Sequence, residues 1–197
     1  ILVRLVGSEM CIRDSFEESS YAELGNQIKC NPSIKYESDR QALIQALLNN
    51  KIDIIATDHA PHTWDEKMMR YQEAPAGLPL VQHGLQILMD FYHQGILSLE
   101  TIVEKTSHNV AKRFQVKDRG YIREGCFADI VIVDSDKKYE VTNDNILYKC
   151  AWSPFLGKTF NSSIYMTICN GHIAFQDGQL NNDIPLGMQI EFCLLYT

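Results

Sequence analysis

The chain has 197 residues, of which 45% are hydrophobic, so it is long and apolar enough to bury a packed core. Its formal net charge of -7 at pH 7 argues against a nucleic-acid-binding surface, and no apolar run approaches the roughly 20 residues of a membrane span. The six cysteines include no Cys-x-x-Cys pair, which predicts reduced thiols in a cytoplasmic protein rather than a disulfide framework.

Both ends of the chain have a sequence that is foreign to a folded domain. Residues 1–15 fit no helix or strand pattern, and the part from Met10 to Ser15 resembles the translation of a DNA adapter used in library preparation. The reverse complement of that adapter encodes the last five residues, 193–197. We therefore exclude segments 1–15 and 193–197 from the fold prediction. The natural protein is then expected to begin upstream, with this chain as its C-terminal part.

A strand, a helix and a second strand are predicted from residue 27 to residue 57. Residues 27–35 form a short predicted strand, and a helix capped by Ser38 and Asp39 follows it to about Asn49. The β-branched apolar run at 52–57 predicts a buried strand. This order and spacing indicate one βαβ unit of a parallel sheet.

Polar residues follow the second strand directly, in the order Asp58-His59-Ala60-Pro61-His62. A lone Asp in such a place is most often a turn residue, and a lone His is most often a surface or core residue. In a parallel α/β barrel, however, the carboxyl end of a strand is where active sites lie. Pro61 stiffens the turn and fixes the spacing of Asp58 and His62, so the combination favours an active site.

The segment from Trp64 to Pro79 lacks a helical period and is predicted to be a loop long enough to have a function. A helix is expected from Leu80 to His93, ended by Gly95, and shorter helices are expected after Ser98 and at 106–114. The inward face of the first helix is predicted to consist of five apolar side chains, Val81, Leu85, Leu88, Met89 and Tyr92.

Short β-rich runs separated by glycines begin at Lys117. The clearest is an apolar strand after Asp129, and Asp129 itself is expected to be a structural turn residue. A hairpin is predicted from Ser163 to Phe175, because Asn170-Gly171 is a strong type I′ turn signal.

The sequence Thr57-Asp58-His59-Ala60-Pro61-His62 after a buried strand resembles the last barrel strand of the cyclic amidohydrolases, and among them the dihydroorotase family. Related hydantoinases and allantoinases usually lack the second histidine. The resemblance covers residues 25–192. It implies an α/β fold with the last strands and helices of a TIM-like (β/α)8 barrel in residues 16–116 and part of a small β-sandwich in residues 117–192.

The resemblance also implies a reaction and a site. The family cyclises N-carbamoyl-L-aspartate to dihydroorotate, reversibly, in pyrimidine biosynthesis, and its zinc-dependent members use one or two Zn2+ ions. It implies that Asp58 is the catalytic proton acceptor and touches the metal, and that the substrate is bound by Asn31, His62, Ala76 and Gly77. The other metal ligands are expected upstream, so this chain alone is expected neither to hold zinc nor to be active.

Two other functions stay open. One is an allantoinase- or hydantoinase-type cyclic amidohydrolase, against which His62 weighs. The other is a non-enzymatic amidohydrolase-like scaffold, against which the intact Asp58 and His62 weigh. The expected partner is a small-molecule substrate, with a homo-oligomer possible and neither nucleic acid nor membrane expected.

Overall fold

The structure, a computed structural model, describes residues 16–181 and 187–193. The adapter-like segments therefore lie outside the described residues, apart from Cys193. Contacts divide the described residues into two units, of which the first contains residues 16–88 and the segment Glu140–Phe160. The second contains Met89–Tyr139 and the described residues from Asn161 onward. The domain boundary predicted at residue 117 rests on composition and stays a prediction.

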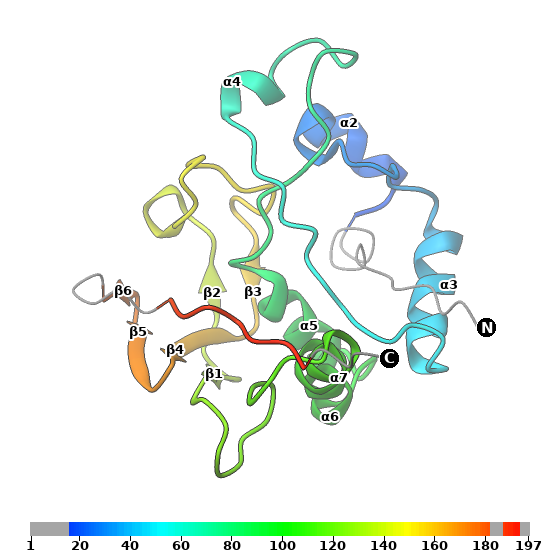
Figure 1. The fold of residues 1–197 in the computed structure, drawn as a ribbon. Helices are drawn as coiled ribbons and strands as arrows, with labels where there is room; N and C mark the ends of the chain where they lie inside the picture. Colours follow the sequence, from blue (N-terminus) through cyan, green and yellow to red (C-terminus); the bar gives the residue numbers. More distant parts are fainter. Residues whose placement is uncertain (1–15, 182–186, 194–197) are drawn as a thin grey trace. The chain divides into compact units, whose positions relative to one another are not determined.

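The first unit consists mainly of short helices joined by long connections (Figure 1). Its largest helix, α3, precedes the connection that carries Asp58. The elements are α2 (Tyr21–Leu24), α3 (Glu37–Leu48), α4 (Trp64–Lys67), the start of α5 (Gly84–His93), β3 (Thr159–Phe160), which pairs with β2 (Tyr139–Glu140), and 3-10 turns at Glu18–Ser20, Gly25–Ile28 and Asn143–Asn145.

The predicted pairing of strands 27–35 and 52–57 is wrong in this structure. Neither segment belongs to a sheet of the described residues, in which one sheet contains β1, β4, β5 and β6 and another contains β2 and β3. Ile52, Ile54 and Ile55 are nevertheless buried, as the apolar pattern predicted. The pattern correctly predicted burial, but membership of a sheet depends on backbone hydrogen bonds to a neighbouring strand, which the pattern does not specify.

Helix α3 starts at Glu37, one residue before the predicted cap. The carboxylate of Asp39 accepts a hydrogen bond from the backbone N–H of Tyr36 at 3.2 Å, so Asp39 stabilises the helix start from inside the first turn. Leu47 is buried, whereas its neighbour Leu48 is 43% exposed, so only Leu47 of this pair faces the interior.

Helix α5 begins at Gly84 rather than Leu80, because residues 81–83 form a turn before it. This later start changes which side chains are buried. Val81 and Tyr92, predicted to point inward, are 59% and 38% exposed, while Ile87 and Phe91 are buried. The predicted buried face is therefore only partly right.

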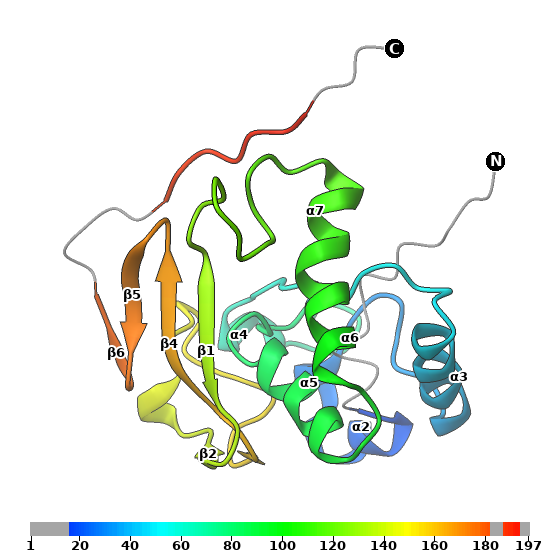
Figure 2. The same cartoon turned by 90° about the horizontal axis from the view of Figure 1, so that it is seen from below.

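The second unit contains an antiparallel sheet with strand order β1-β4-β5-β6. Figure 2 shows the four strands side by side. Asn170 and Gly171 have φ angles of 51° and 82°, which a type I′ turn requires at both positions, so the hairpin prediction is confirmed. The strands are β1 (Ile130–Asp134), β4 (Ser163–Cys169), β5 (His172–Gln176) and β6 (Gln179–Leu180).

Helices α6 (Leu99–Val103) and α7 (Asn109–Phe114) form one continuous helical column, joined by a π-helical turn at Glu104–His108 (Figure 2). The sequence predicted two separate helices here. The predicted cap is confirmed, because the Ser98 hydroxyl accepts a hydrogen bond from the backbone N–H of Thr101 at 3.2 Å.

Asp129 has the structural role that the sequence predicted. Its carboxylate accepts a hydrogen bond from the backbone N–H of Asn170 at 2.8 Å and forms an ion pair with Arg119. The Arg119 guanidinium also donates to the Asn170 side chain at 2.7 Å. These contacts join the start of β1 to the β4–β5 hairpin turn.

Two observations bear on the composition of the chain. No helix in residues 16–181 or 187–193 is long and apolar enough to cross a membrane. Within the same ranges the cysteine side chains form no disulfide, and four of them are half-buried: Cys30, Cys126, Cys150 and Cys169.

Candidate active site

Asp58 follows the buried apolar run and has a left-handed backbone, with φ of 47°. This conformation costs an L-amino acid roughly 1–2 kcal/mol, although Asp and Asn tolerate it better than most residues. The surrounding structure must hold a residue in such a strained conformation, and residues of this kind occur often at functional sites. The Asp58 side chain is exposed, which leaves its carboxylate accessible to a ligand.

The residues after Asp58 pair with the exit of the long loop. The backbone N–H of Ala60 donates to the Leu78 carbonyl at 3.0 Å, and a parallel bridge joins His59 to Leu78. His59 Nδ1 accepts hydrogen bonds from the backbone N–H groups of Leu80 at 3.0 Å and Val81 at 3.3 Å. His59 therefore fixes the start of the next segment through its ring, and burial lowers the pKa of this imidazole.

His62 lies against the loop exit on its other side. Its Nε2 is 3.3 Å from the carbonyl oxygen of Ala76, which can only accept, so the imidazole donates in this contact. Its Nδ1 is 4.0 Å from the Glu66 carboxylate. The structure thus places His62 and Ala76, both predicted substrate-binding residues, in direct contact.

Gly77 makes the closest approach in the site. Its φ is 144°, and a Cβ added there would lie 2.6 Å from the carbonyl oxygen of Ala60 and 3.1 Å from Cδ2 of His62. Only glycine fits this position. The backbone N–H of Gly77 also donates to the Lys29 carbonyl at 2.9 Å, and this bond brings the segment that carries Asn31 to the loop exit.

Asn31 and Asp58 lie close to Gly77 along the backbone of neighbouring segments. Asn31 is two residues from Lys29, and Asp58 is two residues from Ala60, so both lie within about 7 Å of residues in contact with Gly77. The Asn31 side chain is exposed, and the Asn31–Pro32 peptide bond is cis. The predicted site residues therefore come from three separate segments that meet at Gly77.

Lys67 is a residue of the site that the sequence prediction missed. Its side chain is fully buried, and its Nζ donates to three backbone carbonyls around the loop exit. The segment from Trp64 to Pro79, predicted to be all loop, contains the one-turn helix α4, which ends at Lys67. The signal was present as a capping box, in which Thr63 and Glu66 exchange hydrogen bonds at 2.8 and 3.4 Å.

Two charged groups of α4 have shifted pKa values. Burial, with a further contribution from the Lys29 ammonium, lowers the pKa of Lys67 to about 8, so Lys67 is mostly protonated at pH 7. Hydrogen bonds from the backbone and hydroxyl of Thr63 lower the pKa of Glu66. Glu66 is therefore ionised at pH 7 and carries a negative charge near His62.

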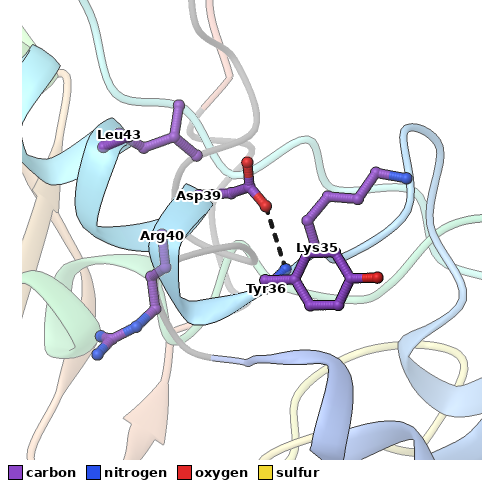
Figure 3. Close-up of a pocket in the computed structure, with 6 residues that line it drawn as sticks. Lys35, Tyr36, Asp39, Arg40 and Leu43 are labelled. Atoms are coloured by element: carbon purple, nitrogen blue, oxygen red, sulfur yellow. Dashed lines mark hydrogen bonds between the residues drawn. The ribbon is translucent and has the colours of Figure 1, made fainter.

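A metal site is not complete in the part of the chain that the structure describes, because no three His, Cys, Asp or Glu side chains are close enough there to hold an ion. The cavity of about 260 Å³ in Figure 3 lies elsewhere, at the start of α3. Its polar groups are used internally: Asp39 accepts from the Tyr36 N–H, and Arg40 pairs with Glu37 at 2.6 Å. It contains none of the predicted site residues.

Comparison with known sequences gives a family match over most of the chain. Residues 13–174 match the amidohydrolase family. The dihydroorotase of Clostridium acetobutylicum is 40% identical over 164 residues, which are 83% of this chain and 38% of that protein. The dihydroorotase of Endomicrobium trichonymphae is 38% identical over 149 residues, 75% of this chain and 35% of that protein. The chain thus spans little more than a third of the length of these curated relatives.

Comparison with solved structures gives the same fold. An L-hydantoinase (dihydropyrimidinase) from Arthrobacter aurescens matches with a TM-score of 0.79 and 23% identity over 87% of this chain and 39% of that one. A D-hydantoinase matches with a TM-score of 0.82 and 20% identity over 90% of this chain and 41% of that one. The α/β fold class predicted from the sequence is confirmed.

Proposed function

The chain belongs to the amidohydrolase family, and we propose that the longer protein in which these residues occur is a dihydroorotase. This protein, of the same length as the relatives, is called the full-length protein. The proposed reaction is the reversible cyclisation of N-carbamoyl-L-aspartate to dihydroorotate, a step of pyrimidine biosynthesis. The observation that carries the proposal is the contact of His62 and Ala60 with the Ala76–Gly77 backbone, because Ala60 lies two residues after Asp58 in the same segment. The sequence relatives named dihydroorotase support it.

Asp58 is the proposed proton acceptor. Its carboxylate is exposed and follows a buried apolar run. The left-handed backbone of Asp58 constrains the position from which this side chain extends. In the cyclisation, the ureido nitrogen attacks the side-chain carboxyl carbon of the substrate and loses a proton, which a carboxylate at this place can accept. The bond from that carbon to one carboxyl oxygen breaks, and the oxygen leaves as water with the proton from Asp58 and one from solvent. In the reverse direction, the protonated Asp58 returns a proton to the leaving nitrogen.

The remaining site residues are proposed to hold the substrate. Asn31 and His62 offer side-chain donors for the substrate carboxylate and ring amide. Backbone groups of Ala76 and the carbonyl oxygen of Gly77, which has a second lone pair, offer fixed hydrogen-bonding partners, and the missing Cβ of Gly77 permits a close approach. The exposure of Asn31 and Ala76 and the partial exposure of His62 support these roles.

Zinc is the proposed metal, on the family resemblance alone. A bound metal ion polarises the carbonyl group under attack and supplies hydroxide at neutral pH. The residues described here do not form a complete site for it, since Asp58 is one ligand and stable zinc sites have three or four. We therefore assign no step of the reaction to the ion. On the same basis we propose a cytoplasmic location and a possible homo-oligomer. We also propose a division into a TIM-like barrel at 16–116 and a β-sandwich at 117–192.

The test is a substrate panel with the full-length protein. We expect turnover of N-carbamoyl-L-aspartate and dihydroorotate that is at least a hundredfold faster than turnover of hydantoin or allantoin. We also expect this turnover to be lost with a chelator and restored by Zn2+. Turnover of hydantoin or allantoin above that of dihydroorotate would reject the proposal in favour of the other cyclic amidohydrolases. No turnover of any member of the panel, with zinc bound, would favour a scaffold.

A further inference from the structure

Lys67 is fully buried, with an exposed fraction of 0%, although lysine is among the residues least often buried. Its Nζ donates hydrogen bonds to the carbonyl oxygens of Gly77 at 2.9 Å, Pro75 at 3.1 Å and Lys29 at 3.2 Å. An ammonium group has three donors and no acceptor, so these carbonyls use its whole hydrogen-bonding capacity. The three hydrogen bonds of the buried ammonium therefore all go to backbone carbonyls, which stabilise its charge.

The three carbonyls flank the backbone that is proposed to bind substrate. Pro75 and Gly77 lie on either side of Ala76, and Lys29 lies two residues before Asn31. The Gly77 N–H, which donates to the Lys29 carbonyl at 2.9 Å, closes a small network with the ammonium. Lys67 therefore joins two chain segments that are distant in sequence, at the point where both carry predicted substrate contacts.

We propose that Lys67 is a positioning residue, which holds the Ala76–Gly77 backbone and the segment carrying Asn31 in the arrangement that binds substrate. The identity of that substrate rests on the proposed dihydroorotase function, whereas the ordering of the backbone does not. Lys67 does not touch the substrate, because its donors are all used and its side chain is buried.

Lys29 provides a matched control from the same region. Its Nζ donates to the carbonyl oxygens of Tyr71 and Ala74, at 2.5 Å in both cases. These carbonyls belong to the same loop but precede Pro75, so they do not flank Ala76 directly. The substitution Lys29→Met removes these two side-chain hydrogen bonds and keeps both the Lys29 carbonyl and the bonds on either side of Ala76.

The experiment compares Lys67→Met and Lys29→Met in the full-length protein. Methionine keeps most of the buried stem and removes the ammonium group. For Lys67→Met we expect the KM for dihydroorotate to rise at least tenfold, kcat to change less than threefold, and the Gly77 amide hydrogen to exchange at least tenfold faster. For Lys29→Met we expect KM and Gly77 exchange within threefold of wild type.

Several outcomes would overturn the inference. A folded Lys67→Met protein with KM and Gly77 exchange within twofold of wild type would do so, as would a fall in kcat at constant KM. If Lys67→Met does not fold, Lys67→Gln takes its place, and failure of both to fold would assign Lys67 to folding rather than to substrate positioning. A wild-type protein without dihydroorotase turnover would reject the proposed function, and Gly77 exchange in the variants would then decide the role of Lys67 separately.

Discussion

The indole N–H of Trp152 donates a hydrogen bond to the backbone carbonyl of His62 at 2.8 Å, across 90 positions of sequence. Trp152 is buried and also packs edge-on against Trp64, with ring centroids 6.0 Å apart. Trp152 lies in a connecting loop, and this loop supports the turn that presents His62 to the loop exit, so the candidate site depends on a part of the chain far from its own motif.

His62→Ala should weaken substrate binding in the full-length protein. A hydrogen bond to a charged group contributes about 1.5–3 kcal/mol, so its loss should raise the KM for dihydroorotate by roughly 10- to 100-fold with a smaller change in kcat. Asn31→Ala should act in the same direction. Trp152→Phe is the control, because it keeps most of the ring packing and removes only the donor to His62, and its effect on KM should be smaller. An unchanged KM in both alanine variants would remove these residues from the binding site.

Asp58→Asn should abolish most of the turnover while the fold stays intact. Asparagine tolerates the left-handed backbone of this position, so the substitution tests the carboxylate without adding strain. The loss in kcat should exceed the roughly 10²-fold lower figure for general acid–base groups. Asp65→Asn, at an exposed carboxylate in the first turn of α4, should leave kcat unchanged. If Asp58→Asn retains activity within tenfold of wild type, Asp58 is not the proton acceptor.

Gly77→Ala should damage both stability and substrate binding. The new Cβ would lie 2.6 Å from the Ala60 carbonyl oxygen, so the backbone of one segment must move. Gly157→Ala is a matched control, because Gly157 also has a positive φ, of 82°, but a Cβ there meets nothing within 4 Å. Thermal unfolding and KM should show a clearly larger effect at Gly77 than at Gly157. Equal effects would mean that backbone strain alone, without the close contact, explains the requirement for glycine.

The stability of the first unit should depend on pH through His83. This side chain is buried among the rings of Tyr148, Phe155 and Phe160, and burial, with a smaller contribution from Lys158, lowers its pKa to about 4. Because the unfolded chain binds the proton near pH 6.5 and the folded chain only near pH 4, the free energy of unfolding should rise with pH across this window. The contribution is on the order of 3 kcal/mol, fully present above pH 6.5 and lost as pH falls to 4.

His83→Phe should remove this pH-dependent contribution. Phenylalanine keeps the ring contacts and does not titrate. Denaturant unfolding at pH 7 and pH 4 should therefore show a smaller loss of stability for His83→Phe than for wild type. The exposed His172 on β5 serves as the control, and His172→Gln should keep the wild-type pH dependence. An identical pH dependence in His83→Phe and wild type would show that other groups cause it.

Local patterns in the sequence predicted features that depend on a few neighbouring residues. The Asn170-Gly171 turn, the Ser98 cap and the burial of Ile52, Ile54 and Ile55 follow from backbone preference or apolar character. The motif from Asp58 to His62 predicted the candidate site on the same local level, and its resemblance to the cyclic amidohydrolases predicted the family, which the family match over residues 13–174 confirms.

Tertiary structure decided what depends on distant partners. The run at 52–57 joins neither sheet, because a strand needs hydrogen bonds to a neighbour that its own sequence does not specify. The start of α5 at Gly84 was set by the turn before it, and this changed which side chains are buried. Lys67 is the clearest case: its local sequence is that of an ordinary exposed lysine at a helix end. Only the three carbonyls that the fold brings around its ammonium make it a buried residue of the site.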